Sequence, residues 1–225
     1  MVKIIHIALL ISIVIVFFSC SDKKQEPPFV PDQQVTRLPH ARFFVVDSQA
    51  YSLVGNTIIH QKQVVFQTER SILTAEYDPE TKLLAVLGTR HVLLIDPQSW
   101  LLLDQIDLGG QPIHLKARKG KIMVLTKAAE TLLSVYQPHN KKLALVSGIQ
   151  KGSIRDFACN RSHIALVAAD SLYFLDQNLN PVSTLPFEGG TAIAMSDSVL
   201  YAKQPKAIWE YRIQNNQLNE GTHFY

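Results

Sequence analysis

Histidine, cysteine and carboxylate side chains would be needed for metal chemistry, and the histidines of this chain are spaced too evenly for a local site. Seven of them follow residue 20: His40, His60, His91, His114, His139, His163 and His223. No two lie three to five residues apart, and HxH, HExxH and CxxC motifs do not occur in the sequence. Zinc and iron sites usually take two ligands from one short segment. The sequence therefore predicts no metal site and no other cofactor.

Cys159 is the second residue type that could do chemistry. It follows Phe157 and Ala158, an apolar context that favours a buried, inert thiol. A nucleophilic cysteine needs an accessible thiolate and a neighbouring base. His163 is four residues away, but the spacing does not show that the two side chains meet. We therefore expect Cys159 to be structural.

Asp96 and Asp176 follow equivalent apolar runs and precede turn residues. An aspartate in that position accepts hydrogen bonds from turn amides, so we interpret both as structural. Asp104 and Asp107 flank an expected outer strand, and we expect both to be solvated. The motifs GxSxG, GxxxxGK[ST] and GxGxxG do not occur in the sequence. The sequence therefore offers no catalytic residue, although it leaves enzymatic activity open.

The N-terminus carries the clearest functional signal. Lys3 is followed by an apolar run over residues 4–18, then by Ser19-Cys20, and the next six residues are polar. A charged start, a short apolar stretch and a small residue at the boundary predict a secretory signal peptide over residues 1–19. The run is too short for a typical membrane span. An uncleaved N-terminal anchor is the alternative.

The Ser19-Cys20 ending resembles a bacterial lipoprotein signal, although Phe17 and Phe18 depart from its usual leucine-first pattern. The resemblance implies that Cys20 becomes the lipidated N-terminus, carrying acyl chains such as palmitate. Residues 20–39 contain four prolines, and this composition predicts a flexible tether. In enterobacterial sorting, Ser21 in place of aspartate implies the outer membrane. We therefore expect a lipid-anchored protein of the bacterial cell envelope.

The rest of the chain, residues 40–225, predicts an all-β domain. Apolar runs of four or five residues, such as 83–87, 92–95 and 122–125, are separated by Asp, Gly, Pro, Asn or Lys. A helical apolar period is not sustained over 12 or more residues. The aromatic residues Trp100, Trp209, Tyr201 and Tyr211 could line a binding face, but aromatics in such runs more often belong to the core.

A repeat organises these strands. Units begin near Ile72, Pro112, Ser153 and Thr191, at spacings of 38 to 41 residues. A weaker copy occupies residues 40–71, with strands expected at 42–47, 51–54 and 58–66. Glycine pairs at 109–110 and 189–190 close two units, and we interpret them as turns that need positive φ. A period near 40 with four short strands predicts a β-propeller.

One unit, residues 91–125, resembles the YVTN type of propeller repeat. Ile95-Asp96-Pro97 ends one strand, Gly109-Gly110-Gln111-Pro112 matches the Gly-x-x-Pro turn, and Ile122-Met123-Val124 begins the next inner strand. The match is partial at 171–190 and poor elsewhere. The resemblance implies the propeller fold and says little about chemistry.

The repeat count predicts about five four-stranded blades. The ring could be complete with five blades, incomplete and closed by association, or open. A two-sheet sandwich is the alternative fold.

The net charge of +3 with scattered basic residues argues against a nucleic-acid-binding surface. The sequence favours a non-enzymatic, membrane-anchored binding or scaffold module for a protein or a glycan, by analogy with propeller lipoproteins that act as scaffolds in outer-membrane assembly. Two alternatives stay open. One is a propeller-type hydrolase or lactonase with a site in the central channel, and the other is a structural unit that assembles with a partner.

Overall fold

Backbone pairing joins strands that are neighbours in the sequence, so every sheet in the described part of the chain is a simple meander. The computed structural model describes residues 42–225. Twenty strands in this range form five four-stranded antiparallel sheets, which we number 1 to 5 in chain order. Within the described range, no helix is long and apolar enough to cross a membrane. The predicted signal peptide (1–19) and tether (20–39) lie outside the described residues and stay predictions.

Sheets 1 and 2 contain the first eight strands. Those of sheet 1 are β1 (Arg42–Val46), β2 (Gln49–Val54), β3 (Thr57–His60) and β4 (Gln63–Gln67). Those of sheet 2 are β5 (Ile72–Asp78), β6 (Leu83–Gly88), β7 (His91–Asp96) and β8 (Leu101–Asp107).

Sheets 3 to 5 repeat the same order. The strands of sheet 3 are β9 (Gln111–Arg118), β10 (Lys121–Lys127), β11 (Thr131–His139) and β12 (Lys142–Gln150). Those of sheet 4 are β13 (Asp156–Cys159), β14 (His163–Val167), β15 (Ser171–Asp176) and β16 (Pro181–Pro186). Those of sheet 5 are β17 (Ala192–Met195), β18 (Val199–Lys203), β19 (Ile208–Gln214) and β20 (Gln217–Phe224).

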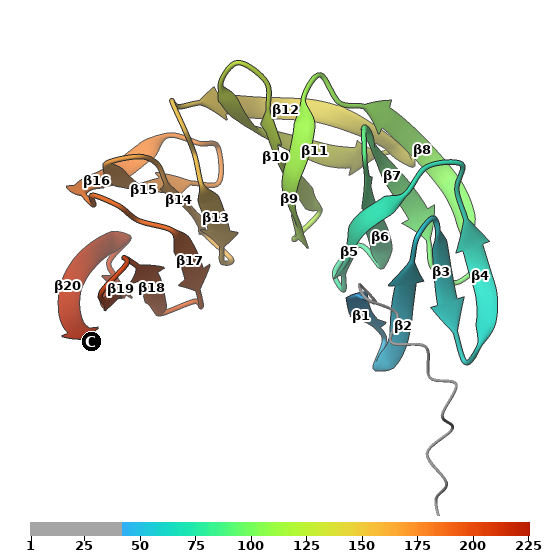
Figure 1. Cartoon of the computed structure of the whole chain (residues 1–225), viewed down its shortest axis with the longest axis horizontal. Coiled ribbons are helices and arrows are strands. Elements are labelled where there is room, and N and C mark those ends of the chain that lie inside the picture. The colour runs from blue at the N-terminus through green and yellow to red at the C-terminus, as the bar shows by residue number, and fades with distance from the viewer. Residues whose placement is uncertain (1–41) are drawn as a thin grey trace, which may run out of the picture. The chain divides into compact units, whose positions relative to one another are not determined.

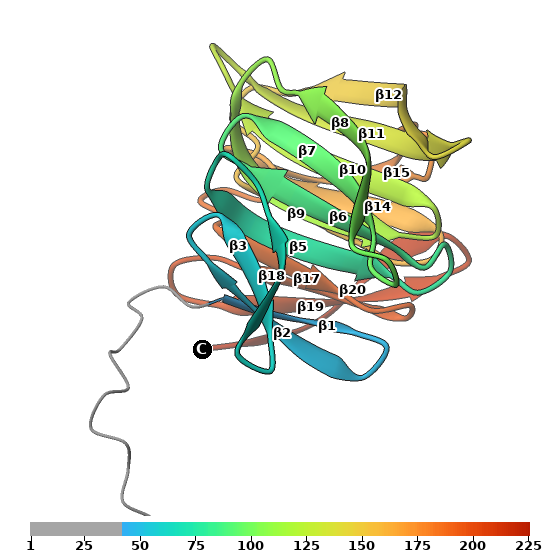
Figure 2. The same ribbon diagram turned by 90° about the vertical axis from the view of Figure 1, so that its right-hand side faces the viewer.

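The five sheets of this domain lie side by side along an arc (Figure 1). The first strand of each sheet lies on the inner side of the arc and the fourth on the outer side (Figures 1 and 2). In the described range, no strand lies between sheets 1 and 5, so the arc is open. The prediction of an all-β domain with five four-stranded units is therefore confirmed, in its open form.

Each pair of consecutive sheets shares one apolar cluster, which gives four clusters for five sheets. Phe157 belongs to the cluster between sheets 3 and 4, and Phe174 and Phe187 to the one between sheets 4 and 5; all three are at most 2% exposed. Burying one such side chain is worth about 1.5–3 kcal/mol. Packing of sheet on sheet therefore supplies the main stabilisation of the domain.

Burial along the second strand of each sheet depends on how many neighbours that sheet has. β6 in sheet 2 is buried at five of its six residues, and β14 in sheet 4 is buried throughout. In contrast, β2 in sheet 1 and β18 in sheet 5 alternate between buried and more accessible residues. The middle sheets are thus covered on both faces, and the two terminal sheets on one.

The single strand expected over residues 58–66 is wrong. The structure has a hairpin there, with β3 and β4 joined at Gln61 and Lys62, whose φ angles are +48° and +69°. Two-residue hairpin turns of this kind favour Asn and Gly. Gln-Lys carries no such signal, so sheet 1 looked three-stranded from its sequence.

The interpretation of the glycine pairs is correct for Gly189, which has φ +70°, and wrong for the others. A Cβ on Gly110 would lie 2.8 Å from the carbonyl oxygen of Lys127, and one on Gly190 would lie 2.6 Å from the Phe187 ring. Close approach of neighbouring atoms, and not positive φ, therefore requires glycine at 110 and 190.

Asp78 at the end of β5 connects sheets 2 and 3. The residue is 3% exposed, and its carboxylate accepts hydrogen bonds from four donors. Two lie in its own turn, the amide of Glu80 and the hydroxyl of Thr81. The other two are the amides of Lys119 and Gly120 in sheet 3, at 3.2 and 2.6 Å. One carboxylate thus fixes two neighbouring hairpins.

Substitution Asp78→Ala is expected to lower the free energy of unfolding by about 3 kcal/mol, because it removes a buried carboxylate that accepts four hydrogen bonds. Asp78→Asn should cost less, since its amide oxygen still accepts. Chemical denaturation followed by circular dichroism measures both. The exposed Glu188→Ala is the control, with an expected change within about 0.5 kcal/mol. Equal stability of Asp78→Ala and wild type would contradict this role.

Candidate functional site

Strand β9 places three basic side chains on one face of the inner wall of the arc. His114, Lys116 and Arg118 alternate with Leu115 and Ala117, which are buried in the cluster between sheets 2 and 3. Side chains in a strand point alternately to opposite faces, so the three basic groups follow one another along a single face. We call them the β9 basic row.

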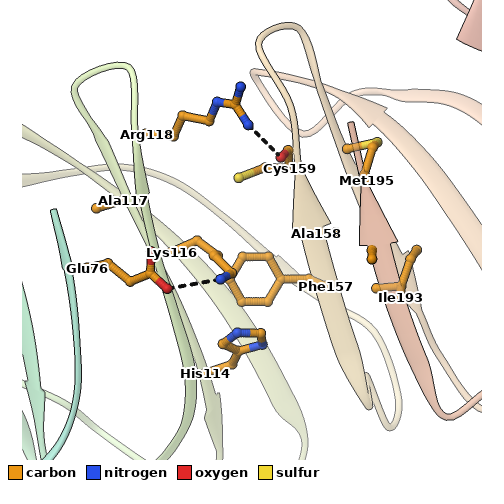
Figure 3. A pocket seen from close by; sticks show the side chains of 11 residues that line it. Glu76, His114, Lys116, Ala117, Arg118, Phe157, Ala158, Cys159, Ile193 and Met195 are labelled. Atoms are coloured by element: carbon orange, nitrogen blue, oxygen red, sulfur yellow. Dashed lines mark hydrogen bonds and ion pairs between the residues drawn. The ribbon is translucent and has the colours of Figure 1, made fainter. Parts of the chain in front are cut away.

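Each member of the β9 basic row contacts a carboxylate of a different sheet. Lys116 Nζ lies 2.9 Å from Glu76 Oε1 in sheet 2, a contact drawn in Figure 3. His114 Nδ1 lies 2.9 Å from Asp156 Oδ1 in sheet 4.

Arg118 reaches further along the arc. Its Nη2 lies 3.6 Å from Asp197 Oδ1 in the β17–β18 turn of sheet 5, and Asp197 also pairs with Arg161 at 3.5 Å. The Nη1 group of Arg118 contacts the Cys159 carbonyl oxygen at 3.5 Å (Figure 3). Partly exposed pairs of this kind are each worth about 0–1 kcal/mol. Their main effect is to orient the side chains along the wall.

Asp156 at the start of β13 contacts groups from three sheets. One oxygen faces His114 and also accepts from the amide of Phe157 at 2.9 Å. The other oxygen accepts from the amide of Ile193 at 3.0 Å. Asp156 therefore joins sheets 3, 4 and 5 through a single side chain.

A cavity of about 390 Å³ opens beside these ion pairs. Its lining includes the charged Lys116 and Glu76 from sheets 3 and 2, and the apolar Ile193 and Met195 from sheet 5 (Figure 3). Ala194, an exposed residue of β17, completes the apolar side. The cavity thus combines charged groups already engaged with each other and a small apolar surface.

Cys159 lines this cavity as a structural residue, as its sequence context predicts. It is 8% exposed, and burial raises the pKa of its thiol to about 11. The thiol is therefore protonated at neutral pH and is a poor nucleophile. Its register partner across the sheet is Ile164.

The other described histidines lie in different sheets. His60 stacks on Tyr51, His163 on Phe174, and His223 packs beside Trp209. His139 is exposed, whereas His40 lies outside the described residues. Among residues 42–225, no three His, Cys, Asp or Glu side chains lie close enough together to hold a metal ion.

His91 is the least expected of these residues. It is 2% exposed, it lines a second cavity of about 400 Å³ between sheets 1 and 2, and within the described range neither ring nitrogen has a hydrogen-bond partner. Burial lowers its pKa below the ordinary value of 6.5, and the charge of Arg70 lowers it further. Burial also lowers the pKa of His163.

Asp96 and Asp176 accept hydrogen bonds within their turns, which confirms their structural interpretation. Asp96 accepts from the Ser99 hydroxyl and the Gln98 amide, and these bonds hold its pKa below the usual value. Asp176 accepts hydrogen bonds from the side-chain and backbone amides of Asn180, and these bonds hold its pKa below the usual value. Asp104 differs from expectation: it is half-buried and accepts from the Leu143 amide at 2.6 Å.

The aromatic residues divide between core and surface. Tyr211 is buried, and Trp100 and Trp209 are partly buried against apolar clusters. Tyr201 alone of these four is an exposed side chain, at 41%. The core interpretation is thus confirmed for three of them and wrong for Tyr201.

Sequence reasoning missed Asp78, Asp156 and the β9 basic row. The row has a sequence signal, because basic residues alternate with apolar ones over 114–118. The acidic partners have none, since they lie 40 or more positions away in other repeats.

Solved structures with a similar arrangement are β-propellers. They include the WD40 β-propeller domain of Doa1 (TM-score 0.57, 14% identity, 79% of this chain and 67% of that chain). BamB from Moraxella catarrhalis is also similar (0.60, 12%, 79% and 62%), as is the Neurospora crassa Pan2 WD40 domain (0.62, 14%, 80% and 64%). The chain therefore spans about two thirds of the length of these propellers. No protein-family model and no curated protein matches the sequence.

At these identities the likeness shows the fold. The propeller prediction is confirmed, and the YVTN resemblance and the lipoprotein signal stay predictions.

Burial of His91 makes stability depend on pH. Its folded-state pKa lies below the unfolded value near 6.5, so the unfolded chain binds the proton more readily. The contribution of neutral, buried His91 to the free energy of unfolding is fully present above pH 6.5. It is lost as the pH falls below 6.5, by at most about 1.4 kcal/mol per pH unit for one group. His91→Phe should flatten this dependence between pH 7.5 and 5.5.

Urea denaturation at a series of pH values measures the effect. The exposed His139→Gln is the control and should keep the wild-type profile. Identical profiles for His91→Phe and wild type would show that His91 does not contribute.

Proposed function

We propose that this chain is a membrane-anchored, extracytoplasmic propeller module that binds a protein partner along the inner wall of its arc. The observation that carries the proposal is the β9 basic row, with its acidic partners in sheets 2, 4 and 5 beside a cavity with an apolar side. Protein interfaces combine an apolar centre with a polar, hydrogen-bonding rim. The inner wall offers both within one surface.

The charges of the wall suit a binding role. Glu76, Lys116, Arg118 and Asp197 are 31–53% exposed as side chains, so a partner's charged groups can reach them. The existing ion pairs hold these side chains in place, which reduces the entropy lost when a partner binds. Complementary charge mainly confers specificity and faster association.

Membrane anchoring rests on the sequence of residues 1–26. The proposal assigns lipidation to Cys20, spacing of the domain from the bilayer to residues 20–39, and outer-membrane sorting to Ser21. A tethered module with an open concave wall would present that wall to partners in the cell envelope.

Binding at the inner wall can be tested with a photo-crosslinking amino acid at Ala194 in the full chain, expressed in cells. We expect one discrete protein adduct, because Ala194 is exposed on the apolar side of the cavity. The matched control is Leu145, which is 64% exposed on the outer strand β12 and should give no adduct.

Charge reversal in the same experiment distinguishes specific binding from nonspecific crosslinking. Lys116→Glu should reduce the Ala194 adduct by about tenfold, the effect of roughly 1.4 kcal/mol, without unfolding the domain. An adduct that resists protease and is removed by a glycan hydrolase would identify a glycan instead. Equal adducts from Ala194 and Leu145 would contradict the proposed surface.

The anchor makes a separate prediction. Metabolic labelling with an alkyne analogue of palmitate should label the full chain, and Cys20→Ser should abolish the label because the acylated thiol is missing. Ser21→Asp should move the labelled protein from outer-membrane to inner-membrane fractions in an enterobacterial host. Cys159→Ser is the control and should retain the label. Labelling of Cys20→Ser would exclude the assigned lipid site.

A further inference from the structure

Sheet 1 exposes an apolar face that carries no charged residue. The strand registers place nine residues on the face turned away from sheet 2. They are Phe43, Val45, Ala50, Ser52, Val54, Thr57, Ile59, Val64 and Gln67. We call this the sheet 1 outer face. Phe43, Val45 and Val64 are 73%, 58% and 57% exposed.

Corresponding faces elsewhere in the domain are covered. In sheet 2, Leu84, Val86 and Leu93 occupy the face turned toward sheet 1 and are at most 1% exposed. In sheet 4, Ile164 and Leu166 occupy the face turned toward sheet 3 and are fully buried. The sheet 1 outer face is therefore apolar like an internal face, but in residues 42–225 nothing packs on it.

The opposite end of the arc is built differently. Registers place Tyr201, Lys203, Glu210 and Arg212 on the face of sheet 5 turned away from sheet 4. This face thus carries three charged residues. Repeat arrays commonly end in a unit with a polar outer face, which keeps them soluble. Sheet 5 has such a face and sheet 1 does not.

We infer that the sheet 1 outer face binds the same face of a second copy of this chain, in a two-fold symmetric dimer. A two-fold contact brings one surface patch onto itself, and an uncharged apolar patch meets itself without burying a charge. Sheets packed face to face also provide a well-known geometry, with mean strand directions about 30° apart.

Charge decides between this dimer and a head-to-tail contact. If sheet 5 of another copy covered the sheet 1 outer face, Lys203 and Arg212 would be buried with only Glu210 of their own face to offset them, because the sheet 1 outer face offers no carboxylate. Burying a charge without a partner is costly.

The dimer surface is distinct from the inner wall. Phe43 and Val45 lie on β1 at one end of the arc, whereas the β9 basic row lies in sheet 3 (Figure 1). The two surfaces can therefore be tested independently.

Cysteine crosslinking of the full chain in its membrane tests the contact. With a short bismaleimide, Val45→Cys should give a crosslinked species of twice the chain mass. Val146→Cys is the matched control, because Val146 is 52% exposed on the outer strand β12. It should give none. The native Cys159 is buried and does not compete.

Val45→Lys provides the second measurement. A lysine in each copy would place two positive charges in the apolar contact and should eliminate the dimer in analytical ultracentrifugation of the detergent-solubilised full chain, whereas Val146→Lys should remain dimeric. Both variants share the same N-terminus, so micelle effects are matched. Circular dichroism should show an unchanged fold, since Val45 is exposed.

A wild type that is monomeric at about 50 μM would overturn the inference, because that concentration is well above a micromolar dissociation constant for the dimer. A dimer that persists in Val45→Lys would also overturn it. So would a Val45→Cys adduct of another mass, which would identify a different partner. A Val45→Cys thiol that reacts with neither crosslinker nor maleimide dye in a monomer would show instead that the chain's own N-terminal residues cover the face.

Discussion

A four-stranded sheet with two apolar faces must be covered on both, and this constraint organises the whole domain. Each of the four apolar clusters takes side chains from two consecutive sheets. Among residues 42–225 no sheet has a core of its own, so each is stabilised by its neighbours. Strands such as β6 and β14 read as continuous apolar runs for this reason. The same constraint leaves two terminal faces, one apolar and one charged.

Polar contacts on the inner side of the arc set how neighbouring sheets are aligned. Asp78 joins sheets 2 and 3, and Asn160 at the end of the β13 hairpin donates to the Ser196 carbonyl oxygen of sheet 5 at 3.0 Å. Apolar packing is not directional, whereas hydrogen bonds between hairpins fix register. The inner side of the arc therefore combines buried side chains that align the sheets, such as Asp78 and Asn160, with the partly exposed charges of the β9 basic row.

Position in the fold explains why chemically capable residues are structural here. Cys159 and His91 are buried, and their pKa values shift toward the neutral form of each group. Asp96 and Asp176 are satisfied by their own turns. The charged groups of the β9 basic row that reach solvent are paired with acidic groups across sheets. A surface of this kind is suited to recognition.

The sequence by itself determined the class of fold and the number of units, because short apolar runs and a 38–41-residue period are local properties. It also predicted the buried state of Cys159 and the turn roles of Asp96 and Asp176, which depend on adjacent residues. The hairpin at Gln61 and Lys62 was missed, since its turn lacks the usual residues. Only the tertiary structure decided that the arc is open and that Asp78, Asp156 and the β9 basic row meet partners in other sheets. Those contacts join residues about 40 or more positions apart, and their geometry comes from how the sheets pack, which no local pattern encodes.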